Sequence, residues 1–327
     1  GAPVPASAVA LTQLPLAAVG SVTMVGYDPE RSKINQDDFA ADACFADDPT
    51  KAVFAVCDGH GPNGRRVANL LASQLVSTLA SELDDDITVD RVFKRAFLKL
   101  NVQLLRSQID CAISGSTCLA LLVSGTRAYV ANVGDSRCVA AIKISDSSVS
   151  NGALEAVEWS VDQKPEVFEE EQRLLAMGAR LAPLGQGYDG HLINRIWLPD
   201  KDTPGIAMSR SFGDSIATTV GVISDPVVTE HELTADTRFV ILATDGIWEF
   251  IGSQEAVEIV GKVLNTGGNV HQAVRKLVVE ASRRWMCHEH LSDDITVIIV
   301  AFDPIRLGKA DSASATRASG ALGSVRV

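Results

Sequence analysis

Apolar residues recur at helical spacing in four segments of the chain. Two early segments, 67–79 and 92–104, carry an apolar residue every three or four positions. Two later segments repeat the pattern at 257–264 and 274–278. This period places the apolar residues on one face of an α-helix. We therefore expect a pair of amphipathic helices toward each end of the chain.

Polar residues in front of three of these segments predict where the helices begin. Thr88, Ser253 and Asn269 are residue types that accept hydrogen bonds from the first turn of a helix when they occupy the N-cap position. Gln272 follows Asn269 by three residues, which is the spacing of a capping box. The sequence thus predicts helix starts at these three positions.

Short apolar runs between the helix pairs predict buried strands, at 52–56, 118–123, 128–133, 138–142, 239–243 and 295–301. The runs 128–133 and 138–142 are joined through Gly134, Asp135 and Ser136, a turn composition that predicts antiparallel neighbours. Strand blocks between two helix pairs favour an α+β fold, in which helices cover a β-sandwich, over a parallel βαβ sheet.

The composition is that of a soluble globular protein with an acidic balance. Of the 327 residues, 46% are hydrophobic and 21% charged, which suffices for a large core. The formal net charge of −12 repels phosphate backbones and anionic lipid, so neither a nucleic-acid partner nor a membrane partner is expected. An acidic protein can still act on a phosphorylated substrate where metal ions invert the local charge.

The cysteines and the residues near the chain ends predict the cellular compartment and the domain boundaries. Six cysteines without a Cys-x-x-Cys pair predict reduced thiols and a cytoplasmic, or also nuclear, protein. The stretch before Asp28 lacks a basic start and contains prolines, so neither a signal peptide nor a membrane span is predicted. We expect one domain over 17–304, tails at 1–16 and 305–327, and a monomer by default.

Three aspartates lie at the ends of apolar strands. Asp58 and Asp245 each follow a predicted strand, and Asp293 precedes another. Carboxylates on rigid strand ends can converge on a hard cation with little ordering cost. The alternative is that each Asp only forms a turn, because Asp and Gly dominate turns. His60 lies beside Asp58 and is either a titratable group at such a site or a turn residue.

Several sequence blocks resemble the metal-dependent protein serine/threonine phosphatases of type 2C, over about residues 20 to 303. In chain order these blocks are NQDDF (35–39), FAVCDGHG (54–61), GST (115–117), YVANVGDSR (129–137), AMSRSFGD (207–214), LATDGIWE (242–249) and SDDITV (292–297). The resemblance implies a four-layer αββα sandwich, with two mainly antiparallel sheets flanked by helix pairs. It also implies two Mn²⁺ or Mg²⁺ ions at one end and a weaker third.

The resemblance implies metal ligands by position. Asp58 resembles the bridging ligand, Gly59 the ligand that binds through its carbonyl, and Asp245 and Asp293 the terminal ligands. Asp294 occupies a position where many family members have Asn. These assignments are consistent with the strand-end carboxylates described above.

Further roles follow from the same comparison. Asp37 resembles an outer-sphere acid that holds metal-bound water. Asp135 resembles the acid of the third metal, with a plain turn residue as the alternative. His60 resembles a general acid that protonates the leaving oxygen. The implied nucleophile is a hydroxide shared by two metal ions.

The sequence departs from the family pattern near the predicted phosphate site. Many members carry an Arg five residues before the acid matched by Asp37, and this chain has Ser32 there. Arg31 and Lys33 flank Ser32, so either cation is a candidate phosphate-binding residue, Lys33 as a point charge. Gln36 replaces the commoner Glu and cannot supply its charge.

The region of about 163–204 resembles the family's flap, which borders the active site and varies between members. Its charged part, 166–173, is interpreted as a solvated helical face, and substrate choice is the alternative role. The overall hypothesis is metal-dependent hydrolysis of phosphoserine and phosphothreonine in phosphoprotein substrates. The alternative is a weakly active, phosphatase-like scaffold that binds a partner. A nucleotide-processing enzyme is disfavoured, since no G-x-x-x-x-G-K-[ST] loop is present.

Overall fold

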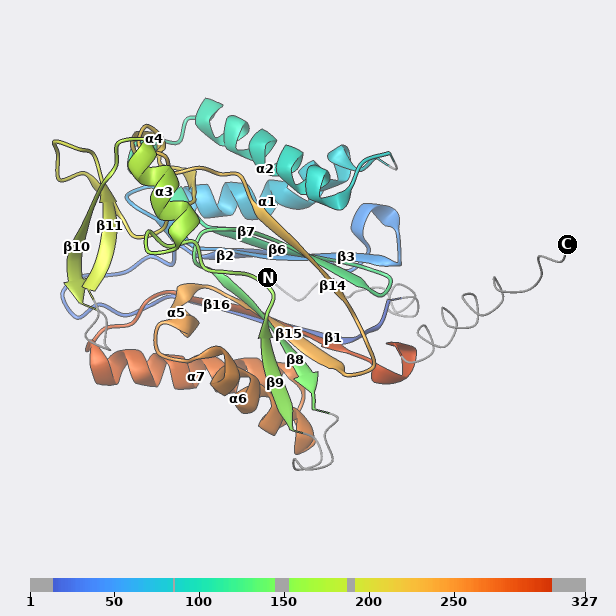
Figure 1. Ribbon diagram of the computed structural model, residues 1–327. Coiled ribbons are helices and arrows are strands. Elements are labelled where there is room, and N and C mark those ends of the chain that lie inside the picture. The colour runs from blue at the N-terminus through green and yellow to red at the C-terminus, as the bar shows by residue number, and fades with distance from the viewer. Residues whose placement is uncertain (1–13, 85, 145–152, 187–191, 308–327) are drawn as a thin grey trace, which may run out of the picture.

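The computed structural model describes residues 14–84, 86–144, 153–186 and 192–307. Two five-stranded sheets pack face to face, and a pair of helices covers the outer face of each (Figure 1). The predicted four-layer αββα sandwich is confirmed. None of the described helices combines the length and the apolar character that crossing a membrane requires.

The first sheet, called sheet I, has the strand order β1-β16-β15-β8-β9. Its neighbours are all antiparallel. Its strands are β1 (Leu16–Met24), β8 (Arg137–Lys143), β9 (Leu154–Glu158), β15 (Thr237–Ala243) and β16 (Ile295–Phe302). Strand β16 is buried along almost its whole length, as expected for a central strand covered on both faces.

The second sheet, sheet II, has the order β14-β7-β6-β3-β2 and is also antiparallel throughout. Its strands are β2 (Asp38–Asp42), β3 (Lys51–Cys57), β6 (Cys118–Ser124), β7 (Arg127–Val133) and β14 (Val227–Glu232). Apolar side chains of alternating residues from both sheets, Phe54 and Ile298 among them, form a central core between the sheets.

The helix pairs pack where the periodicity predicts. Helices α1 (Gly64–Glu82) and α2 (Val89–Arg106) cover sheet II through a core that includes Phe93 and Phe97. Helices α6 (Ser253–Asn265) and α7 (Val270–His288) cover sheet I through a third core. These apolar faces are hidden from water, which is the main source of the stability of such helices.

The predicted helix starts are partly correct. Asn269 caps α7 in a capping box with Gln272, and Thr88 is the N-cap residue of α2. The prediction for Ser253 is wrong, because Gly252 is the N-cap residue of α6 and Ser253 is the first helical residue. The Ser253 hydroxyl instead donates to Glu158 of β9 at 2.6 Å, so a tertiary partner replaces the local cap.

The predicted hairpin between β7 and β8 is wrong. Strand β7 belongs to sheet II and pairs with β6 and β14, whereas β8 belongs to sheet I and pairs with β15 and β9. The residues Gly134, Asp135 and Ser136 therefore carry the chain from one sheet to the other. Gly134 has a φ of 109°, and this left-handed backbone permits the crossing.

Smaller elements lie at one end of the sandwich. Three two-residue strands, β4 (Gly59–His60), β5 (Gly115–Ser116) and β13 (Phe212–Gly213), form a small sheet. The flap consists of α3 (Phe168–Ala176), β10 (Arg180–Gln186), β11 (Leu192–Trp197) and β12 (Pro204–Ile206). Short helical segments are η2 (Phe45–Asp47), α4 (Ser215–Thr218) and α5 (Asp245–Trp248).

The described fold reaches slightly beyond the predicted domain boundaries. Leu14 and Leu16, placed in the predicted tail 1–16, are buried in the central core. Leu307, from the predicted tail 305–327, is buried in the same core. The rest of the two predicted tails, 1–13 and 308–327, lies outside the described residues. All six cysteines are free thiols, four of them buried.

Candidate active site

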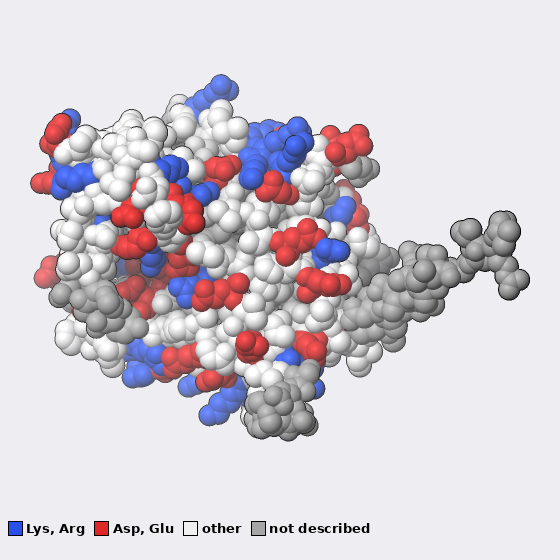
Figure 2. All heavy atoms as spheres, in the orientation of Figure 1, with Lys and Arg blue, Asp and Glu red and all other residues white. Residues whose placement is uncertain are grey.

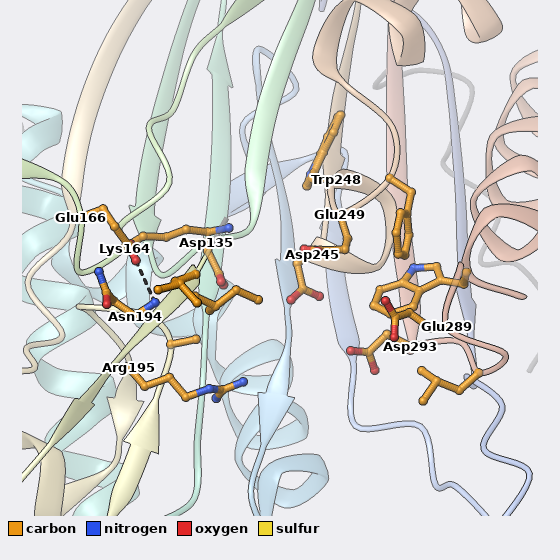
Figure 3. Close-up of a pocket in the computed structure, with 16 residues that line it drawn as sticks. Asp135, Lys164, Glu166, Asn194, Arg195, Asp245, Trp248, Glu249, Glu289 and Asp293 are labelled. Atoms are coloured by element: carbon orange, nitrogen blue, oxygen red, sulfur yellow. Dashed lines mark hydrogen bonds between the residues drawn. The ribbon is translucent and has the colours of Figure 1, made fainter. Parts of the chain in front are cut away.

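A cleft of about 800 Å³ lies at the end of the sandwich where strands of both sheets terminate. Figure 2 shows acidic and basic side chains inside this hollow, below the flap. The carboxylates of Asp135, Asp245 and Asp293 point into it from different sides (Figure 3). Asp58 follows β3 of sheet II, whereas Asp245 follows β15 and Asp293 precedes β16 of sheet I. The sandwich thus unites acids that are far apart in the sequence.

Asp58 and Asp245 carry a large electrostatic penalty when ionised. Burial raises the pKa of Asp58 well above its ordinary value, and repulsion from Asp37 and Asp245 adds to this effect. Burial likewise raises the pKa of Asp245, with repulsion from Asp135 and Asp293. Clustered carboxylates in a low-dielectric site attract cations strongly.

Asp37 and Asp135 each bury an oxygen that lacks a hydrogen-bond partner among the described residues, Oδ1 in both cases. Asp37 is only 4% exposed, and its Oδ2 accepts a 2.9 Å hydrogen bond from Thr244. Burial raises the pKa of Asp37 to about 7, against the opposing effect of hydrogen bonds from Thr296 and Thr244. A buried acceptor without a partner is costly, so both oxygens point to a ligand.

Gly59 occupies a position that admits no side chain. A Cβ atom there would lie 2.4 Å from the carbonyl oxygen of Gly64 and 2.6 Å from that of Gln36. Such contacts would force the backbone apart. Glycine therefore keeps the main chain close beside Asp58, as a carbonyl ligand requires.

The donor set fits hard divalent cations. Within the described ranges, no three His, Cys, Asp or Glu side chains form a compact ligand group by themselves. Mg²⁺ is commonly held by one or two carboxylates with water completing its shell, and Mn²⁺ prefers the same oxygen ligands. Carboxylates that meet from both sheets at an open cleft, with unpartnered oxygens on Asp37 and Asp135, match that chemistry.

His60 is held by a carboxylate that the sequence did not single out. Its Nε2 lies 2.6 Å from Oδ2 of Asp214, and the same Oδ2 accepts a 2.6 Å hydrogen bond from Ser211. Burial lowers the pKa of His60, but attraction to Asp214 outweighs it and the net shift is upward. Asp214 closes the AMSRSFGD block, which was the available signal for it.

The tight surroundings of Asp214 explain why residue 115 is a glycine. A Cβ atom on Gly115 would lie 2.0 Å from Oδ2 of Asp214. Asp214 itself has a φ of 41°, a left-handed conformation that Asp tolerates better than most residues. The small sheet of β4, β5 and β13 thus presses His60 against Asp214.

The two predicted phosphate-binding cations lie in different surroundings. Lys33 donates to Oδ1 of Asp293 at 2.8 Å and to the Ser292 carbonyl at 3.2 Å, so it lies at the acidic cluster. The Arg31 side chain is 81% exposed and pairs with Asp28 at 2.7 Å. Neither cation lines the cleft itself, but Lys33 binds Asp293, which does. The geometry therefore favours Lys33 over Arg31 as the candidate phosphate-binding residue.

Two other cations line the cleft and were not predicted. Lys164 is surrounded by acids, and although burial lowers its pKa, attraction to Asp135 and Asp162 raises it overall. Arg195 of β11 donates to the Gly205 carbonyl at 2.8 Å, while its buried Nε has no partner among the described residues. Arg195 lies on β11 of the flap, outside the sequence motifs, so the sequence alone did not indicate it.

Asp294 is accommodated by backbone donors. Its Oδ1 accepts a hydrogen bond from the Gly26 N–H at 2.7 Å, and its Oδ2 accepts one from the Gln36 N–H at 2.8 Å. A carboxylate has two acceptor oxygens, so it can bind both backbone N–H groups at once. Asp294 therefore fixes the loop that leads to Asp37.

The interpretation of 166–173 as a solvated face needs correction. Glu170 of α3 is buried and binds Arg173, Arg210 and Ser209 through its carboxylate. Burial would raise the pKa of Glu170, but these hydrogen bonds lower it to about 2. Glu170 anchors the flap, because Arg210 lies on the segment that leads to Asp214.

Comparisons with known proteins agree with this fold. The sequence profile of protein phosphatase 2C matches residues 29–289, and the chain belongs to that family. It is 34% identical to "Probable protein phosphatase 2C 35" of Arabidopsis thaliana over 294 residues, covering 84% of this chain and 81% of the relative. "Probable protein phosphatase 2C 64" of Oryza sativa subsp. japonica is also 34% identical, over 84% of this chain and 64% of that protein.

Solved structures support the fold. A serine-threonine phosphatase 2C from Toxoplasma gondii superposes with a TM-score of 0.74 at 21% identity, over 89% of this chain and 98% of the other. A C. elegans sex determining protein gives a TM-score of 0.70 at 20% identity, over 89% and 66% of the respective chains. With the family match, the protein is a serine/threonine protein phosphatase.

Proposed function

We propose that this phosphatase uses two Mn²⁺ or Mg²⁺ ions, held by Asp58, the Gly59 carbonyl, Asp245 and Asp293, to hydrolyse phosphoserine and phosphothreonine in proteins. The observation that carries the proposal is the meeting of strand-end carboxylates from both sheets at one end of the sandwich, where burial and mutual repulsion raise the pKa of Asp58 and Asp245. Divalent cations at such a site lower the pKa of a water molecule and neutralise developing phosphoryl charge.

The protein's own residues orient the reaction. Asp37, held by Thr244, is placed to accept a hydrogen bond from water within the cleft. Lys33, Lys164 and Arg195 supply positive charge for the substrate phosphate. His60, fixed by Asp214, is proposed to protonate the departing serine or threonine oxygen, which is a poor leaving group. Asp135 is proposed to hold a weaker third ion.

The test is hydrolysis of a phosphothreonine peptide by the purified protein with Mn²⁺, with excess chelator, and with an Asp245→Asn variant. Phosphate release should require the metal and vanish in the variant. Equal release with chelator would contradict the metal proposal. No release under any condition by a folded protein would support the scaffold alternative.

The expected location is also a proposal. The six free thiols favour a reducing compartment, and we propose the cytoplasm. Fractionation of cells that express the native protein would test this.

A further inference from the structure

The active-site cleft has two chemically different walls. The flap side contributes two cations, Lys164 and Arg195, together with the acids Asp135 and Glu166. The Glu166 carboxylate already accepts a hydrogen bond from the Asn194 N–H. The opposite side comes from α5, the following residues and the end of α7, and it is aromatic and acidic, with Trp248, Glu249, Phe250, Trp285 and Glu289. Figure 3 shows Trp248, Glu249 and Glu289 across the cavity from Lys164 and Arg195. A phosphate is attracted to one side, and a positive group to the other.

The aromatic wall is rigid. The Trp285 Nε1–H donates to the Gly246 carbonyl at 2.8 Å. The rings of Phe250 and Trp285 meet edge to face, with centroids 4.8 Å apart, and His288 stacks on Phe250 at 5.0 Å. Arg284 donates to the Phe250 carbonyl at 2.6 Å. A preorganised surface loses little entropy when a ligand binds.

Glu289 is placed where a carboxylate is unfavourable without a partner. It is the C-cap residue of α7, and its N–H donates to the Trp285 carbonyl at 2.8 Å. The C-terminus of a helix carries partial negative charge, so an anion there is destabilised. Within the described part of the chain, no hydrogen bond or ion pair is formed by its exposed side chain. A cation from another molecule would relieve this repulsion.

The neighbouring acid and aromatic groups are partly engaged by this chain's own cations. Arg137 lies over the Trp248 ring, 5.3 Å from its centroid, and Lys33 binds Asp293. These contacts show that this end of the cleft suits basic groups. They leave Trp285 and Glu289 as the pair that can receive an external cation.

We infer that Trp285 and Glu289 form a subsite for a lysine or arginine side chain that flanks the phosphorylated residue of the substrate. The basic side chain would contact the indole ring and pair with the Glu289 carboxylate. The inference rests on the proposed phosphatase function, because it assumes that a phosphopeptide occupies the cleft. It makes Glu289 a specificity-determining residue.

The experiment compares kcat/KM for phosphothreonine peptides of one length that carry a single Arg, Ala or Glu at each of three positions on either side. The wild-type enzyme should prefer Arg over Ala by roughly tenfold at one of these positions, because a cation–π contact and an ion pair both favour Arg. Glu at that position should be disfavoured.

Substitution then assigns the preference. Glu289→Lys should remove or reverse the Arg/Ala ratio, and Glu289→Gln should reduce it. The matched control is Glu258→Lys, the same charge change at an exposed residue of α6 that does not line the cleft, and it should keep the wild-type ratio. An equal ratio in Glu289→Lys and wild type would overturn the inference.

The peptide series distinguishes failure of the basic subsite from failure of the phosphatase function. Hydrolysis of the Ala peptides without any Arg preference would leave the phosphatase function intact and reject the basic subsite. A preference for Glu peptides would reject it as well. Absence of hydrolysis for every peptide with Mn²⁺ present would contradict the proposed function itself.

Discussion

His60 and Asp214 are 154 residues apart in the sequence, yet Nε2 of the imidazole lies 2.6 Å from Oδ2 of the carboxylate. The contact fixes the orientation of the imidazole ring. It leaves Nδ1 buried without a hydrogen-bond partner among the described residues. Asp214 is thus a positioning residue for the proposed general acid, in the way that a carboxylate orients a catalytic histidine in other hydrolases.

Asp214→Asn should impair the reactions that need a proton donor. We expect kcat for a phosphothreonine peptide to fall by about 10²-fold, the lower end of what general acid catalysis contributes. p-Nitrophenyl phosphate, which has a much better leaving group, should be affected far less. Steady-state assays with both substrates give the comparison. An equal fall for the two substrates would indicate a purely structural role.

Arg195→Ala should weaken substrate binding. Its guanidinium is held by the Gly205 carbonyl and lines the cleft, so its loss removes positive charge from the phosphate side. We expect KM for a phosphopeptide to rise about tenfold, since a hydrogen bond to a charged group contributes roughly 1.5–3 kcal/mol. Arg127→Ala is the control and should leave KM unchanged, because Arg127 of β7 forms an exposed ion pair with Glu230 of β14.

Asp58→Asn should abolish the stabilisation by Mn²⁺ without destabilising the metal-free protein. Burial raises the pKa of Asp58, so ionising it costs folded-state stability that grows as the pH rises through the raised pKa. In chelator at neutral pH the Asn variant should therefore be at least as stable as wild type. Saturating Mn²⁺ should raise the Tm of wild type by about 5 °C and leave the variant almost unchanged. Thermal unfolding with and without Mn²⁺ measures both effects, and an equal Mn²⁺ shift in the two proteins would remove Asp58 from the ligand set.

Glu170→Gln should destabilise the flap in a pH-dependent way. The pKa of Glu170 is lowered to about 2, so its ion pairs stabilise the fold above its ordinary pKa of 4.5 and lose this effect as the pH falls toward 2. At pH 7 the variant should lose roughly 3 kcal/mol, because Arg210 and Arg173 lose their buried partner. Urea unfolding should show the difference shrinking below pH 4. Glu169→Gln, an exposed neighbour on α3, should have little effect at any pH.

Local pattern predicted the four long helices and six of the ten strands in the two large sheets, but it missed β1, β2, β9 and β14. The apolar face of α2 and the capping box of α7 depend on residues within one or two turns, so short-range spacing reveals them. The hairpin between β7 and β8 failed because a turn composition permits a reversal without specifying which sheet the next strand joins. The sheet that each strand joins was decided by its tertiary partners, which are β6 and β14 for β7 and β15 and β9 for β8.

The candidate acids could be named from sequence because they lie in motifs at strand ends. The partners of these residues could not. Asp214 for His60, Thr244 for Asp37 and the backbone N–H groups for Asp294 are contacts across the fold. Glu170 looked like a surface residue because a charged helix is usually solvated, and only the approach of Arg210 made its burial favourable.

The sequence by itself determined the layer order and the family and named the candidate acids, because apolar period and motif residues are local properties. The tertiary structure decided where the cations lie: Lys164 and Arg195 line the cleft, Lys33 binds Asp293 at its edge, and Arg31 pairs with Asp28. It also placed Glu289 and Trp285 on the opposite wall. Charge acts over a few ångströms in space, and only folding sets those distances.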